Sequence, residues 1–496
     1  MEKHNAEVAR IASEVQGFHY RKEQFRIYHG STNSTRASNR RRDQIVDTSA
    51  LNQVVRIDKE RKRAFVEPKV RMDELVHATL PFNLVPPVVM EFPAITAGGG
   101  FAGMGCESSS FKYGLFDATI LSIEVILADG TVVNASATEK SDLFFGAART
   151  CGSLGIVTLL EVRLIQAKPY VELTYHPVTS IDAAVELCHS FTKDEGHVDF
   201  VEGIIYSPER GAIITGIFAD SKTKGSKVRR FTRARDQWFY IHAERQVRNR
   251  TTPVTELVPI VDYLFRYDRG AFWTGKVGFD YFSVRCDRLS RLALNRLLHT
   301  ETMYRALHYS ELDQKVILQD YVLPYSTSNG FIQYVNQTCK IFPLWLCPIK
   351  PPAPQSSTMY KHPFSEDMLL NIGVWGPGPK ERDAFVQLHR DIEHKVNSLH
   401  GIKWPYSHSY WTEAEFWGFY NQDAYGELRA KWNAALLPSM YDKLKADPAP
   451  AAESKNDNPN RSRIVNRVWN IWPVPGLYGV LKVLVGADYL LRKPKA

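Results

Sequence analysis

Two hydrophobic periodicities alternate along this 496-residue chain. Between residues 7 and 16, apolar side chains recur every three or four positions, which predicts an amphipathic helix that ends near Gly17. A similar stripe predicts a second helix over residues 381–399. Short runs rich in β-branched residues predict strands at residues 25–28, 45–48, 53–57, 64–67, 119–128, 131–134 and 156–164. The chain therefore mixes helices with short strands.

The pattern changes near residue 170, where the sequence becomes more aromatic and less rich in glycine. Strands are predicted at residues 170–177, 200–207 and 212–218, around a helix at residues 181–192. The aromatic run at residues 263–273 suits either a packed core or the wall of an apolar substrate channel, because aromatic side chains serve both.

The most unusual segment is Thr96 to Gly114, in which six of nineteen residues are glycine. Glycine allows positive φ and a close approach between backbone and ligand. The serines that follow, Ser108 to Ser110, add hydrogen-bond donors without bulk. A flexible loop is the plain alternative, but this segment lies between strongly apolar stretches, so we favour a loop that cradles a cofactor.

Two further loops have a similar character. A predicted strand leads into a turn of small, donor-rich residues at positions 29–35, which suits an anion such as a pyrophosphate but could also be a polar surface loop. Residues 151–158 form a second glycine-containing loop that leads into a strand.

Composition and charge narrow the class of protein only slightly. With 44% apolar and 23% charged residues, the chain is typical of globular proteins, and its net charge of +8 suits anionic partners. The six scattered cysteines lack the spacing of a zinc site or a disulfide framework, so we expect no metal site and an intracellular location. Residues 1–10 are polar and no uninterrupted run of about 20 apolar residues occurs, so we expect neither a signal peptide nor a spanning helix.

Several motifs together resemble a known family. The sequence GCESSSFKYGLF at residues 105–116 and LADG at residues 127–130 resemble the Δ24-sterol reductase (Diminuto-like) branch of the vanillyl-alcohol-oxidase, or PCMH-type, FAD-binding flavoproteins. The resemblance extends from about residue 10 to about residue 446. Further segments that carry it are residues 200–206, 343–348, 400–401 and 415–417, together with Tyr406 and Tyr410.

The resemblance implies an α+β fold with a defined division. A PCMH-type FAD-binding domain with two subdomains would occupy residues 1–169. An α+β substrate or cap domain would occupy residues 170–446, with C-terminal elements that return to the flavin. Composition predicts a disordered linker at residues 447–463. Residues 464–496 form an amphipathic tail that suits either a membrane interface, with Trp469 and Trp472 as anchors, or packing against the protein's own body.

The resemblance also implies an FAD site built from three loops. At the pyrophosphate we expect His29, Gly30, Ser31, Thr32 and Asn33. Along the rest of the cofactor we expect Thr96, Ala97, Gly98, Gly99, Gly100, Gly103, Met104, Gly105, Cys106, Glu107, Ser108 and Ser109. On the adenosine side we expect Gly152, Gly155, Ile156 and Val157. Covalent attachment through Cys106 or His29 is an open alternative, and we favour a non-covalent flavin.

The implied activity is the reduction of an isolated double bond, the Δ24 bond of a sterol side chain, with NADPH as electron donor. Because an unactivated alkene has no carbonyl to polarise, a positioned acid must protonate one carbon. Our candidates are Tyr410 and Tyr406, followed by Tyr321 and Glu202. The alternatives are an FAD-dependent oxidase or dehydrogenase acting on another isoprenoid or secondary metabolite, and a flavoprotein or lipid-binding protein without catalytic activity.

The expected partner is a hydrophobic small molecule, and a membrane surface is a further candidate. Residues 222–250 are strongly basic and include Trp238, Phe239 and Tyr240, which suits a helix on an anionic membrane or a solvated surface better than nucleic-acid binding. We expect the protein in the cytoplasm or at the cytoplasmic face of the endoplasmic reticulum. The sequence does not assign an oligomeric state.

Overall fold

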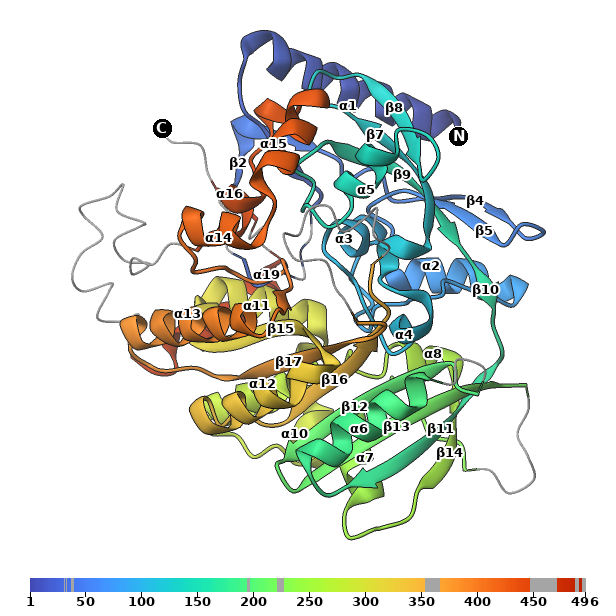
Figure 1. Cartoon of the computed structure of the whole chain (residues 1–496), viewed down its shortest axis with the longest axis vertical. Helices are drawn as coiled ribbons and strands as arrows, with labels where there is room; N and C mark the ends of the chain where they lie inside the picture. The colour runs from blue at the N-terminus through green and yellow to red at the C-terminus, as the bar shows by residue number, and fades with distance from the viewer. Residues whose placement is uncertain are drawn as a thin grey trace.

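The computed structural model describes residues 1–30, 32, 34–36, 40–193, 197–220, 227–352, 366–446, 471–486 and 490–492. Figure 1 shows an N-terminal part, in blue to cyan, above a larger part in green to orange. Each part is built around an antiparallel sheet. The predicted boundary at residue 169 falls between these sheets and remains a prediction, and the predicted linker at residues 447–463 lies outside the described residues.

The N-terminal part contains a five-stranded sheet in the order β4-β5-β9-β7-β8. Its strands are β4 (Val54–Asp58), β5 (Arg63–Val66), β7 (Ile120–Ile126), β8 (Val132–Ser136) and β9 (Ile156–Arg163). A second, two-stranded parallel sheet pairs β1 (Arg26–Tyr28) with β3 (Ile45–Asp47). The helices of this part are α1 (Glu2–Arg21), α2 (Met72–Thr79), α3 (Ala97–Ala102), α4 (Ser110–Tyr113) and α5 (Ser141–Ala147). The observed α1 extends beyond its predicted range at both ends.

The Asp129–Gly130 dipeptide between two predicted strands favours a hairpin whose two turn residues both have positive φ. The hairpin forms, but with a different turn. Only Gly130 adopts a positive φ, of 87°, and its amide donates to the Leu127 carbonyl at 2.9 Å. The Asp129 carboxylate instead accepts from the amide of Thr131. The turn therefore requires one glycine and an aspartate acceptor, not two residues at positive φ.

The larger part is organised by an eight-stranded sheet in the order β14-β11-β13-β12-β16-β17-β15-β18. Its strands are β11 (Tyr170–Val178), β12 (Phe200–Ser207), β13 (Arg210–Ala219), β14 (Val254–Pro259), β15 (Val316–Pro324), β16 (Leu344–Ile349), β17 (Leu369–Pro377) and β18 (Ile402–Lys403). Helices α6 (Ile181–Thr192), α12 (Tyr325–Thr338) and α13 (Arg382–Ser398) cover one face, which we call the outer face.

The other face of this sheet, the inner face, packs toward the N-terminal part and carries α7 (Phe239–Val247), α8 (Ile260–Leu264), α9 (Thr274–Tyr281), α10 (Arg288–Ala293) and α11 (Thr300–Ser310). Successive residues of a strand point to opposite faces. In β15, Val322 belongs to the inner core whereas Ile317, Tyr321 and Leu323 belong to the outer core. Asp320 therefore points to the inner face.

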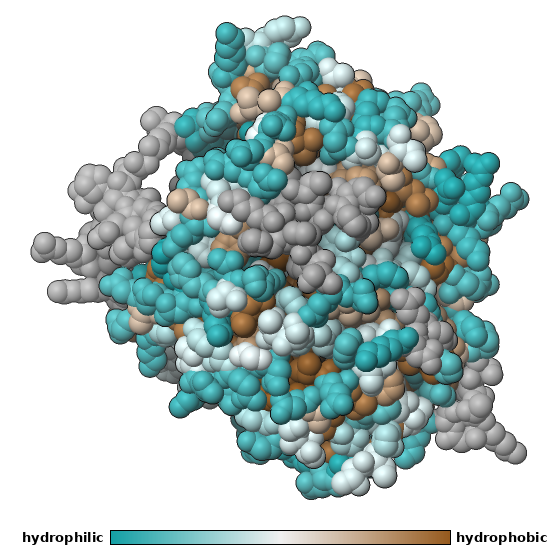
Figure 2. Space-filling model, viewed as in Figure 1, coloured by the Kyte–Doolittle hydropathy of each residue, from teal (hydrophilic) through white to brown (hydrophobic). Residues whose placement is uncertain are grey.

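Within the basic, aromatic segment at residues 222–250, the described residues 227–250 do not form a helix lying on the surface. Its aromatic residues Trp238, Phe239 and Tyr240 are buried in the inner core. The prediction of a membrane-lying or solvated helix is therefore wrong for these aromatics. The surface seen in Figure 2 is mostly hydrophilic, and its apolar residues occur in small areas.

The chain returns to the N-terminal part after the eight-stranded sheet. Helices α14 (Glu413–Phe419), α15 (Gln422–Lys431) and α16 (Met440–Leu444) lie beside it in Figure 1. Arg429 donates to the Ser153 carbonyl at 2.6 Å, and Lys443 donates to those of Cys151 and Gly152. The third predicted loop is thus fixed by this returning segment.

The tail packs on the protein's own body where the structure describes it. Helix α19 (Val474–Val485) lies against α11, and the indole of Trp472 donates to the Tyr281 carbonyl at 2.6 Å. Strand β19 (Leu491–Arg492) pairs with β2 (Arg40–Arg41). Among the described residues, no helix combines the length and the apolarity needed to cross a bilayer.

Candidate active site

A cavity of about 1410 Å³ lies between the glycine-rich segment and the inner face of the eight-stranded sheet. Helices α9, α11 and α19 contribute residues to its wall. Its lining includes a polar, basic group of residues around Arg36, which we call the basic end, and an aromatic group around Trp375 and Tyr406, which we call the aromatic end; the two adjoin where Ser34 donates to the Tyr406 carbonyl. The predicted residues that line the cavity are His29, Thr32, Thr96, Gly99, Gly100, Gly103, Met104, Gly105, Cys106 and Tyr406.

The glycine-rich segment begins as a short helix and turns along the cavity. Thr96 caps α3 by accepting a hydrogen bond from the Gly99 amide at 3.1 Å. A Cβ atom at Gly100 would lie 2.3 Å from the Met90 Cε, and one at Gly105 would lie 2.7 Å from the Met90 Sδ. A larger residue at either position would have to displace the flexible end of Met90, which packs closely against both glycines. Their close packing leaves the segment's backbone as the wall of the cavity.

Basic side chains surround the polar end. Arg36 lines the cavity, and its guanidinium donates to Ser34 and to the carbonyl of Lys443. The Nδ1 atom of His29 is buried and has no hydrogen-bond partner. Desolvation and the nearby charges of Arg40, Lys69, Lys443 and Arg36 lower the pKa of His29 to about 3. Desolvation, together with neighbouring arginines, lowers the pKa of Lys443 to about 7. An anion such as a diphosphate would relieve this concentration of positive charge.

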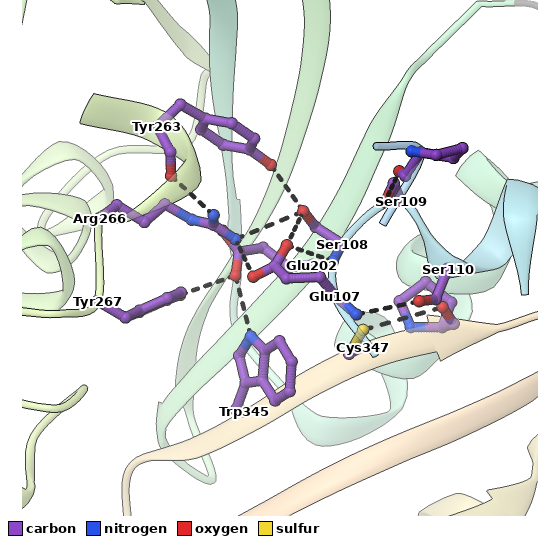
Figure 3. Close-up of polar contacts among 12 residues, drawn as sticks. Glu107, Ser108, Ser109, Ser110, Glu202, Tyr263, Arg266, Tyr267, Trp345 and Cys347 are labelled. Carbon is purple, nitrogen blue, oxygen red and sulfur yellow. Dashed lines mark hydrogen bonds and ion pairs between the residues drawn. The ribbon is translucent and has the colours of Figure 1, made fainter. Parts of the chain in front are cut away.

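A buried ionic network connects the glycine-rich segment to the inner face of the sheet (Figure 3). The guanidinium of Arg266 donates to Glu107 at 2.8 Å and to Glu202 at 2.9 Å, and its side chain is fully buried. Tyr267 and Trp345 also donate to Glu202, at 2.8 and 2.9 Å. Ser108 is hydrogen-bonded to Tyr263 at 2.8 Å. Every partner is buried, so the network fixes the position of the glycine-rich segment relative to the eight-stranded sheet.

The aromatic end contains a hydroxyl–carboxyl pair. The Tyr406 hydroxyl donates to Asp320 at 2.7 Å, and Asn371 donates to the other oxygen of Asp320 at 2.9 Å. Burial raises the pKa of Asp320 to about 6 and, together with the Asp320 charge, raises the pKa of Tyr406 well above its usual value. Aromatic rings lie beside this pair, with Phe272 and Trp375 packed at a ring separation of 4.3 Å.

Glu91 lines the same cavity and is a second acid. Desolvation, followed by the charge of Glu107, raises its pKa to about 8. Both carboxyl groups therefore bind protons more tightly than exposed carboxyl groups do. Near pH 7, Glu91 can therefore hold a proton, whereas Asp320 is mostly ionised and is suited to accept the hydrogen bond from Tyr406.

The four proposed proton donors lie in different places, and Tyr406 is the one that lines the cavity. Tyr321 is in the outer core and donates to Gln319. Tyr410 is in the outer core as well, beside Phe385 and Arg382. Glu202 lies on the inner face but is occupied by Arg266, Tyr267 and Trp345.

Comparison with known proteins agrees with this geometry. Residues 4–136 match the model of the FAD binding domain family. The chain is 32% identical over 440 residues to the Delta(24)-sterol reductase of Pisum sativum, covering 81% of this chain and 76% of that protein. The chain belongs to the Delta(24)-sterol reductase family. The Arabidopsis thaliana relative is 30% identical over 433 residues, covering 81% and 76%. The Homo sapiens relative is 29% identical over 403 residues, covering 79% and 76%.

The α+β fold class and the resemblance to this family are therefore confirmed, and FAD is the cofactor of the matched domain. The residue assignments remain predictions. Ser31 and Asn33 lie outside the described residues. The predicted cofactor residues that do not line the cavity are Gly30, Ala97, Gly98, Glu107, Ser108, Ser109, Gly152, Gly155, Ile156 and Val157.

Several residues of the site were missed by sequence reasoning. Arg36 follows the predicted pyrophosphate turn directly, so its charge beside that turn was a usable signal. Asp320 directly precedes Tyr321, one of the candidate proton donors. Because side chains alternate between the two faces of β15, Asp320 faces the cavity and Tyr321 faces away from it. Nothing local singled out Glu91, Arg266 or Lys443, because their roles depend on contacts with distant segments.

Proposed function

We propose that this chain is an FAD-dependent oxidoreductase that reduces the side-chain Δ24 double bond of a sterol. The observation that carries the proposal is the two-ended cavity, with a basic, glycine-lined end and an aromatic end that contains one hydroxyl–carboxyl pair. Its volume of about 1410 Å³ exceeds the roughly 300–1,000 Å³ of a typical single-ligand pocket. It suits a cofactor and an apolar substrate together.

The residues present fit FAD. The segment from Thr96 to Cys106 offers backbone for close approach, Arg36 offers donors and positive charge for the diphosphate, and His29 offers a neutral imidazole beside it. When bound there and reduced by the electron donor, the flavin would supply the hydride that one alkene carbon accepts. We infer a non-covalent flavin. The hydrogen bond with Cys347 lowers the pKa of Cys106, but burial and the nearby carboxylates outweigh it and leave the pKa raised, which disfavours a reactive thiolate.

In this proposal Tyr406 gives the proton to the other alkene carbon. Its hydroxyl lies in the cavity wall, and Asp320 fixes its orientation through the 2.7 Å hydrogen bond. After that transfer, a proton that Asp320 takes up from solvent can pass to the tyrosinate along the same hydrogen bond, since burial raises the pKa of Asp320 to about 6. Phe272, Trp345 and Trp375 exclude water from this end.

The alternative of an oxidase or dehydrogenase acting on another isoprenoid or secondary metabolite is not favoured. The relatives that match about four-fifths of this chain are named reductases. Cytokinin dehydrogenase 7 of Oryza sativa is 32% identical over 133 residues, which is 26% of this chain. That similarity covers only about a quarter of each of the two chains.

We further propose NADPH as the electron donor and the cytoplasmic face of the endoplasmic reticulum as the location. The family resemblance supports both assignments, and the net charge of +8 favours an anionic surface.

The decisive experiment mixes purified holoprotein with NADPH under anaerobic conditions and then adds a Δ24-unsaturated sterol. We expect the flavin absorbance to bleach with NADPH and to return when the sterol is added, with a product two mass units heavier. A sterol with a saturated side chain is the matched control and must leave the flavin bleached. Failure of NADPH to bleach the flavin would remove the proposed donor, and failure of the sterol to restore the colour would remove the proposed substrate.

A further inference from the structure

We propose that the exposed side of α19 and the neighbouring residues 284–294 dock on an anionic membrane surface and admit the substrate to the cavity there. We call this surface the α19 face. The docking part of the proposal stands on the surface itself, and the substrate part rests on the proposed function.

Helix α19 is packed in the opposite sense to an ordinary amphipathic helix. Its buried residues are Pro475, Gly476 and Gly479. A Cβ atom at Gly476 would lie 2.5 Å from the Tyr281 ring, and one at Gly479 would lie 2.6 Å from the Ala306 carbonyl. The small residues thus seat the helix closely on α9 and α11. Its large apolar residues consequently face outward, where folding alone gives them no stabilisation.

Exposed apolar side chains are concentrated on this face. In the described part of the chain, eleven of the sixteen exposed large hydrophobic residues belong to it. These are Val284, Leu289, Leu292, Leu294, Ile471, Trp472, Leu477, Tyr478, Leu481, Leu484 and Val485. Leu289 is 77% exposed and Val485 is 72% exposed. Isolated exposed leucines are ordinary, but a concentration of this kind marks an interaction surface.

The charge beside these residues favours an anionic bilayer over a second copy of the chain. Residues 276–296 contain five basic and two acidic residues, for a net charge of +3. Asp280 is paired with Lys276, and Asp287 caps the start of α10. Helix α19 adds Lys482 and no acidic residue. Two such faces would repel one another, whereas anionic headgroups would be attracted while the leucines and Trp472 enter the interface.

The same face forms part of the cavity wall. Val284, Leu294, Trp472 and Leu477 are exposed and also line the cavity. The cavity lining therefore includes exposed side chains of this face as well as the aromatic residues Phe272 and Trp375. A sterol-like molecule is poorly soluble in water, so a path that opens toward lipid lets it enter without crossing the aqueous phase.

The test uses flavin-loaded full-length protein and sedimenting vesicles of phosphatidylcholine, with or without phosphatidylserine. The variant is the double substitution Leu481→Glu/Leu484→Glu, because both side chains are exposed and neither lines the cavity. The matched control is Ile217→Glu on β13, where the isoleucine is 45% exposed. We expect wild-type protein and the control to bind phosphatidylserine vesicles, and the double variant to bind at least about tenfold more weakly. Flavin absorbance and thermal unfolding check that each variant is folded.

A second measurement separates docking from catalysis. The double variant should reduce a dispersed, cyclodextrin-carried Δ24 sterol at the wild-type rate and the same sterol in vesicles much more slowly. If wild-type protein does not bind vesicles, or if the double variant binds as well as the control, the docking proposal is wrong. Equal loss of the two activities overturns the entry route, and absence of both wild-type activities overturns the proposed function without affecting the binding result. A wild-type dimer that the double variant makes monomeric, without vesicle binding, would assign the face to a second copy instead.

Discussion

The two ends of the cavity respond to the same burial in opposite ways. At the basic end, burial and neighbouring cations lower the pKa of His29 to about 3 and that of Lys443 to about 7, while Arg36 remains charged. At the aromatic end, burial raises the pKa of Asp320 to about 6 and that of Glu91 to about 8. The basic end therefore keeps positive charge that an anionic ligand neutralises. The acidic groups tend to take up protons, which leaves the aromatic end suited to a neutral, apolar ligand.

The strongest test of this division removes the connection between the two ends. Replacing Arg266 by Met leaves Glu107 and Glu202 buried without their cation, and such a change costs about 3–5 kcal/mol. We expect urea unfolding to show a loss of this size in the free energy of unfolding. The matched control is Arg63→Met, which breaks a half-exposed pair with Glu161 and should cost less than about 1 kcal/mol. Equal losses in the two variants would show that the Arg266 network does not connect the parts of the site.

Removing the proposed proton donor tests the aromatic end alone. Tyr406→Phe deletes the hydroxyl that donates to Asp320, so we expect kcat to fall by about 10²- to 10³-fold while NADPH reduces the flavin at an unchanged rate. Rapid-reaction spectroscopy can follow the two half-reactions separately. Tyr321→Phe is the matched control, because this tyrosine lies one residue from Asp320 but in the outer core, and it should leave both rates close to wild type. If Tyr321→Phe lowered kcat more than Tyr406→Phe, Tyr321 would be the proton donor in place of Tyr406.

The sequence predicted the basic end better than the aromatic end, for a physical reason. A loop that cradles a dinucleotide is continuous in the chain, so Thr96 to Cys106 could be recognised from local composition. The aromatic end is assembled from β15, β16, β17 and the segment that contains Tyr406, so it depends on pairing between distant strands. Asp320 and Tyr321 are neighbours in β15, yet Asp320 lies in the cavity and Tyr321 in the outer core. A register error of one residue would exchange the two. The order of helices and strands along the chain could be predicted from the sequence. The register between paired strands, and the face of the sheet to which each side chain points, could not.

The basic end is tested by Arg36→Gln. Losing a charge-assisted contact to the diphosphate should weaken FAD binding by about 10- to 100-fold, measured by fluorescence during titration of the apoprotein. Arg41→Gln is the matched control, since Arg41 is exposed and pairs with Asp43. If added FAD restores the variant's activity to the wild-type level, Arg36 acts in binding alone. An unchanged FAD affinity would show that the diphosphate does not bind at this end of the cavity.

The smallest expected effect concerns the proton on Glu91. Its pKa is raised from 4.5 to about 8 in the folded protein, so the folded state binds the proton more tightly than the unfolded state. The resulting stability is fully present below pH 4.5 and is lost as the pH rises toward 8. Within this window each pH unit changes the free energy of unfolding by about 1.4 kcal/mol. Glu91→Gln keeps the shape but does not titrate, so its stability relative to wild type should rise by about that amount between pH 6 and pH 7. Urea unfolding of both holoproteins at the two pH values measures the difference. An unchanged difference would mean that Glu91 is already ionised in the folded state, and the aromatic end would then carry a fixed negative charge.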